Sequence, residues 1–178
     1  MPSVDSEFDE FADIVQVERG VRPLFIVGSS QVDRLLFEIL STHLLPKTSK
    51  SKEEDELLEG EKCPFSVRIK MCARLGLIDQ TLHKDLERLR KIRNKCAHLV
   101  EFSHTESPTK DLLSDLRRSV ETRESFDLVR KRYFAGSTQN AIEEYQCVLL
   151  TLCALLQAVK NATTKTMGNN ATLRISAR

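Results

Sequence analysis

The chain has 178 residues, of which 40% are hydrophobic and 30% charged, the balance expected of one soluble globular domain. With six glycines and five prolines, it has too few chain-breaking residues for a turn-dense sandwich or barrel. No apolar run approaches the roughly 18 residues that a membrane-spanning helix needs, and the acidic start is unlike a secretory signal. The five cysteines contain no C-x-x-C pair, which argues against a disulfide framework and a zinc site. The chain is therefore expected to be cytoplasmic, with no metal, no cofactor and no membrane association.

Hydrophobic spacing predicts helices in the first part of the chain. Phe8, Phe11 and Val15 recur at helical spacing within the acidic opening. A second stripe of period near 3.6 runs from Phe25 to Leu40, and Pro23 suits the first turn of that helix. The segment 46–62 is polar and strongly charged, so we expect a charged loop there.

The second half begins with two helices whose ends are marked. Phe65 to Leu75 predicts a helix, and Gly76 fits the position after its C-terminal cap. Asp79 can cap the next helix, whose buried face is lined by Leu82, Leu86, Leu89 and Cys96.

A loop ending at Pro108 follows, then a shorter helix near 109–120, while 121–136 is ambiguous. Asn140 and Glu143 resemble a capping box at the start of the last helix, whose apolar stripe reaches Val159.

No segment alternates strictly between apolar and polar residues, so the predicted fold is all-α. It is a bundle of four principal helices with additional short helices. We assign 1–162 to a single helical domain and 163–178 to a basic, flexible tail.

The net charge of +1 conceals an uneven distribution of charge. Residues 68–95 hold nine basic side chains against three acidic ones, and 117–132 hold six against three. Such a basic region can hold RNA or DNA, with Arg68, Arg90, Lys91 and Lys95 as candidate nucleic-acid-binding residues. The alternative is that these charges lie on the solvated faces of amphipathic helices.

The most informative string is Arg93-Asn94-Lys95-Cys96-Ala97-His98. Histidine can accept a proton at neutral pH, and arginine can stabilise charge on a phosphorane, so Arg93, Asn94 and His98 are candidate catalytic residues for metal-free RNA cleavage. On one ideal helix, however, Arg93 lies about 140° around from His98. The alternative is a polar network between helices. Two weaker patterns are Cys96-x-His98, better explained by a buried thiol, and the His83–Glu87 pair, better explained by surface residues.

This string resembles the R-N-x3-H signature of HEPN domains, which are small helical bundles found in many ribonucleases. Together with Pro64 to Ile78 and Leu86 to His98, it resembles the mannitol operon repressor (MltR-like) family. The resemblance implies an all-helical, dimeric protein with a regulatory role, although no DNA-reading motif is found. Two functions follow. One is a regulatory or interaction protein with a protein partner, and the other is a HEPN-type ribonuclease that uses Arg93 and His98 on RNA.

Overall fold

The computed structural model describes residues 4–44, 58, 62–99 and 101–176, with side chains from 6 to 164. These residues form helices and no strand, which confirms the all-α prediction. The helices are α1 (Val4–Val17), α2 (Val21–His43), α4 (Phe65–Arg74), α5 (Gln80–His98), α6 (Thr109–Glu121), α7 (Glu124–Tyr133) and α8 (Ala141–Ser176). The ambiguous segment 121–136 therefore contains α7, and the predicted loop 46–62 lies outside the described residues except for Leu58 and Lys62.

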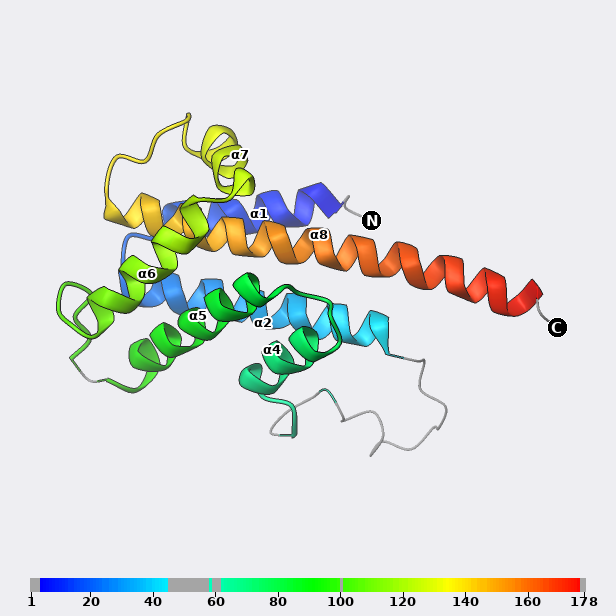
Figure 1. Cartoon of the computed structure of the whole chain (residues 1–178). Coiled ribbons are helices and arrows are strands. Elements are labelled where there is room, and N and C mark those ends of the chain that lie inside the picture. Colours follow the sequence, from blue (N-terminus) through cyan, green and yellow to red (C-terminus); the bar gives the residue numbers. More distant parts are fainter. Residues whose placement is uncertain (1–3, 45–57, 59–61, 100, 177–178) are drawn as a thin grey trace.

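Helices α2 and α8 form the centre of the bundle and run side by side in the same direction (Figure 1). Gly28 allows their close approach, since a Cβ at this position would meet the methyl groups of Leu149 at 2.8 Å. Helix α5 packs against α2, α4 and α6, while α1 and α7 pack against α8. The core consists of the apolar faces of these helices, including Phe25, Leu36 and Leu152.

Several helix ends follow from the local sequence as predicted. Gly76 has φ +69°, and the N–H groups of Gly76 and Leu77 donate to the carbonyls of Ala73 and Cys72, as in a Schellman motif. The Asp79 carboxylate accepts a hydrogen bond of 2.6 Å from the N–H of Leu82 and caps α5.

The Asn140 side chain caps α8 in the same way, accepting from the N–H groups of Ile142 and Glu143. Glu143 reaches back to the N–H of Gln139, one residue earlier than in a standard capping box.

Helix α8 differs from the sequence-based expectations in two respects. Its backbone stays helical to Ser176, whereas the sequence pattern ends the helix near Asn161, and its C-terminal end extends beyond the other helices (Figure 1). The flexibility expected of 163–178 stays a prediction.

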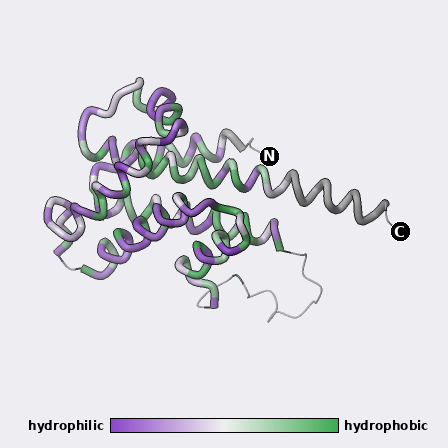
Figure 2. Tube along the Cα trace, viewed as in Figure 1, coloured by the Kyte–Doolittle hydropathy of each residue, from purple (hydrophilic) through white to green (hydrophobic). Residues whose placement is uncertain are grey.

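The expectation that no segment could span a membrane is also corrected. Ala141–Thr164 is long and apolar enough by length and composition alone. Half of the most apolar 18-residue stretch within this segment is buried in the bundle. The position of α8 in the core therefore accounts for its apolar residues, which are green in Figure 2.

Candidate functional site

Among the described residues, Arg93 contacts Asn94, but no hydrogen bond joins either of these candidate catalytic residues to His98. Arg93 and His98 are both exposed on α5, and His98 is its last residue. The Arg93 guanidinium makes one long contact, 3.4 Å to the side-chain oxygen of Asn94. A general base and its electrostatic partner must converge on one reacting group, and no interaction recorded between described residues brings these two side chains together.

Cys96 lies between them in sequence but points into the core. It is fully buried, and burial raises the pKa of its thiol to about 11. The neutral thiol therefore fills core space, as the sequence interpretation of Cys96-x-His98 favours.

Arg68 has a structural environment. Its side chain is 13% exposed and its guanidinium donates to Asp33 and to the Leu58 carbonyl, both at 2.7 Å. The guanidinium also lies 5.4 Å from the centre of the Phe37 ring. These contacts join α4 to α2. They engage the guanidinium group that the sequence analysis predicts to bind a nucleic acid.

The other candidate nucleic-acid-binding residues lie on α5. Both Nε and Nη2 of Arg90 donate to the same oxygen of Glu87, at 3.1 and 2.9 Å. Lys91 is exposed and Lys95 is half-buried. Lys91 is the predicted nucleic-acid-binding residue that lines the surface hollow described next.

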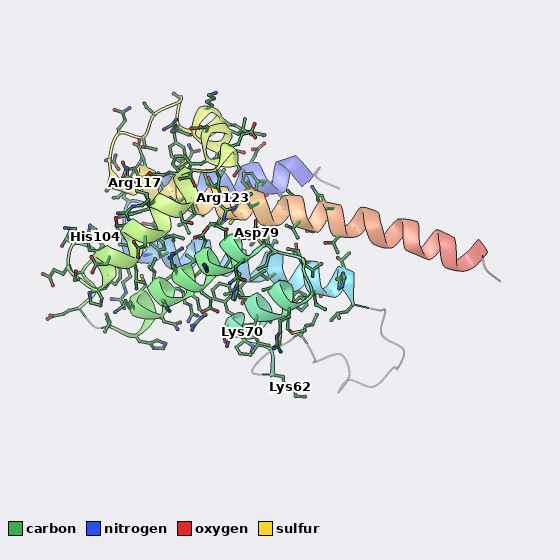
Figure 3. All side chains as sticks on the ribbon, in the orientation of Figure 1. Lys62, Lys70, Asp79, His104, Arg117 and Arg123 are labelled. Carbon is green, nitrogen blue, oxygen red and sulfur yellow. The ribbon has the colours of Figure 1, made fainter. Side chains whose placement is uncertain are left out.

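Two adjoining hollows lie on the surface of α4 and the first three turns of α5, and together we call them the α4–α5 hollow. One, of about 420 Å³, is lined by Lys70, Ala73, Arg74, Gln80 and His83. The other, of about 270 Å³, is lined by Gln80, His83, Lys84, Glu87, Arg88 and Lys91. Figure 3 labels Lys70 on α4 and Asp79 immediately before α5. The α5 residues share one helical face because they are spaced by three or four positions.

His83 lies where the two hollows join, and both of its ring nitrogens are buried without a hydrogen-bond partner in the described structure. Oε1 of Glu87, one helical turn further on, is also buried without a partner. Sequence spacing pairs these two residues as a surface pair, but the structure records no hydrogen bond between them. The hollow thus combines unpaired hydrogen-bonding atoms with a surplus of basic side chains.

Beneath this face lies a buried ion cluster that sequence reasoning missed. Asp85 is fully buried, and its two oxygens accept hydrogen bonds of 2.9 Å from Arg88 and Arg123. The available signal was a carboxylate on the same helical face as Leu82, Leu86 and Leu89. Arg123 precedes α7, as labelled in Figure 3, so the cluster fastens the start of α7 to α5.

No protein-family model matches the chain, and no curated protein matches it by sequence. Its fold, however, is similar to that of two solved structures. One is a possible transcriptional regulator, YggD, from Shigella flexneri, with a TM-score of 0.57 and 15% identity over 90% of this chain and 98% of that one. The other is from the MtlR–HPr complex of Escherichia coli, with a TM-score of 0.57 and 15% identity over 88% of this chain and 98% of that one. The chain therefore shares its all-helical fold with these two solved structures.

Proposed function

We propose that this chain is a regulatory or interaction protein that acts by binding a protein partner. The observation that carries the proposal is the likeness of fold across about nine-tenths of the chain to a possible transcriptional regulator and to a structure solved as a protein–protein complex. A protein partner, rather than DNA read by the chain itself, also agrees with the lack of a DNA-reading motif in the sequence.

The α4–α5 hollow is the surface that we assign to this partner. Lys70, Arg74, Lys84 and Lys91 line it and make no ion pair within the described residues. Unpaired exposed cations steer an oppositely charged protein and set its orientation. The partner should therefore present an acidic surface to α5.

The ribonuclease alternative receives no comparable support. No hydrogen bond between described residues joins Arg93 to His98 on α5, and the two similar structures are not described as nucleases. We expect the protein to act in the cytoplasm as a homodimer. Light scattering of the purified chain tests the dimeric state.

The proposal is tested by affinity capture from an extract of the source organism. The wild type should retain one protein stoichiometrically, and the complex should reassemble from the two purified components. Lys84→Glu with Lys91→Glu should abolish this complex. The matched control is Lys110→Glu with Lys131→Glu, which changes the charge equally on exposed positions of α6 and α7. If both double variants bind equally well, the assigned surface is wrong. If no complex reassembles, the function is wrong.

A further inference from the structure

The α4–α5 hollow contains a histidine whose hydrogen-bonding capacity is unused. Both ring nitrogens of His83 are buried without a partner in the described structure. A buried polar group without a partner costs stability, so such groups in folded proteins call for an explanation. Neutral imidazole offers one donor and one acceptor. Both nitrogens are closed to solvent as the ring stands, so a ligand in the hollow would satisfy them after the imidazole turns about its side-chain bonds.

The charge around His83 specifies the sign of that ligand. Lys70 and Arg74 line the hollow from α4, and Lys84 and Lys91 line it from α5. None of these four forms an ion pair within the described residues, while Arg88 is engaged by Asp85. Two unpaired cations in each of the two adjoining hollows, on either side of His83, favour a compact anion of more than one charge.

The single carboxylate in the lining adds a second requirement. Oε2 of Glu87 is held by Arg90, but Oε1 is buried with no donor. A bare anion would leave that oxygen unsatisfied. A ligand with an N–H or O–H donor close to its anionic group would satisfy this oxygen once the Glu87 carboxylate turns toward the hollow.

We propose that the α4–α5 hollow binds a phosphate monoester that carries a hydrogen-bond donor beside the phosphate. The phosphate carries close to two negative charges at pH 7 and three acceptor oxygens. Its oxygens accept from His83 and from the ammonium groups of Lys84 and Lys91, and the neighbouring donor satisfies Glu87. The shared chemistry covers a small hydroxylated phosphate ester and a phosphorylated side chain of a partner. With the free ester as ligand this site goes beyond the proposed function, and with a partner's phosphorylated side chain it rests on that function and specifies the partner's chemistry.

The test uses the full chain and two probes, glycerol 3-phosphate and a capped Gly-phosphoserine-Gly peptide. Binding is measured by calorimetry and by the NMR signals of the histidine rings. The chain has four histidines, and His43, His98 and His104 lie outside the lining of the hollow. We expect at least one probe to shift the His83 signals selectively, and the tighter probe identifies the source of the phosphate.

Two variants separate binding from folding. His83→Leu removes the unsatisfied nitrogens and should keep the wild-type melting temperature, while affinity falls about tenfold, as expected for the loss of one charge-assisted hydrogen bond. Lys84→Ala with Lys91→Ala changes exposed positions and should weaken binding further. Lys110→Ala is the control and should bind like the wild type.

Either of two results would overturn the proposal: no His83 shift with either probe at 10 mM, or equal affinities in the hollow variants and the control. Since no partner protein is present, these outcomes are independent of the capture experiment above.

Discussion

At the scale of single residues, the Asp85 cluster ties the junction between α6 and α7 to α5. The Asp85 side chain is 0% exposed, and it holds Arg88 and Arg123 at 2.9 Å. Breaking a buried ion pair by removing one partner leaves an uncompensated charge in a poorly hydrated place. Asp85→Ala should therefore lower the free energy of unfolding by about 3 kcal/mol in urea titrations.

The control for this prediction is Asp127→Ala, which removes an exposed pair between Asp127 and Arg130. Exposed pairs contribute about 0–1 kcal/mol. Equal losses in the two variants would show that burial of the Asp85 cluster has no energetic consequence.

Gln146 serves as a cap supplied by another helix. It is buried in α8, and its side-chain nitrogen donates to the carbonyls of Val15, Gln16 and Glu18, at 2.9, 3.2 and 2.9 Å. These carbonyls lie at the C-terminal end of α1, where the helix itself provides no donors. Gln146→Leu should cost about 1–3 kcal/mol and should speed hydrogen exchange selectively at the end of α1.

Gln157→Leu is the matched control, because Gln157 also lies on α8 but its side-chain nitrogen donates to the Asn161 side chain at the surface. The capping role of Gln146 would be refuted by an unchanged exchange rate in α1.

At the scale of elements, two glycines are required for different physical reasons. Gly76 has φ +69° and open space where a Cβ would lie, whereas Gly28 is helical and faces Leu149 at 2.8 Å. Gly76→Ala should cost about 1–2 kcal/mol of backbone strain. Gly28→Ala should cost about 1–3 kcal/mol through overpacking between α2 and α8.

A second substitution at each position distinguishes these causes. Gly76→Asn should recover part of the loss, because asparagine tolerates the left-handed region. Gly28→Ala with Leu149→Val should recover stability, because the shorter valine side chain leaves space for the new Cβ. Thermal unfolding of the four variants measures both effects. If neither second substitution recovers stability, backbone strain at Gly76 and overpacking at Gly28 are not the causes of the two losses.

Helix positions were predictable where one residue fixes an end. Gly76, Asp79 and Asn140 each act through bonds to their own neighbours, and each forms the predicted cap. Contacts between distant segments were not predictable in this way. Arg68 is a predicted nucleic-acid contact, and helical spacing gave no sign of its bonds to Asp33 and to the Leu58 carbonyl. The unpaired state of the His83 nitrogens likewise depends on how α4 packs on α5, which helical spacing alone does not specify.

At the scale of the whole molecule, the buried thiols make stability depend on alkaline pH. Burial raises the pKa of Cys72 and of Cys147 to about 12 and that of Cys96 to about 11. An unfolded cysteine loses its proton near pH 8.5. Below that pH both states are protonated, so the stabilisation is fully present. Above it the unfolded state ionises first, and stability falls as the pH rises toward 11 for Cys96 and 12 for the other two.

Each of these thiols should contribute a slope of about 1.4 kcal/mol per pH unit within that window. Urea unfolding between pH 8 and 10.5, under reducing conditions, measures the combined slope. Cys72→Ala and Cys147→Ala lose stability at every pH through the cavities they create, so the slope rather than the absolute value is compared. Each variant should show a shallower fall than the wild type. All other titrating groups are common to the proteins compared, so an unchanged slope in both variants would show that the Cys72 and Cys147 thiols do not cause the alkaline loss.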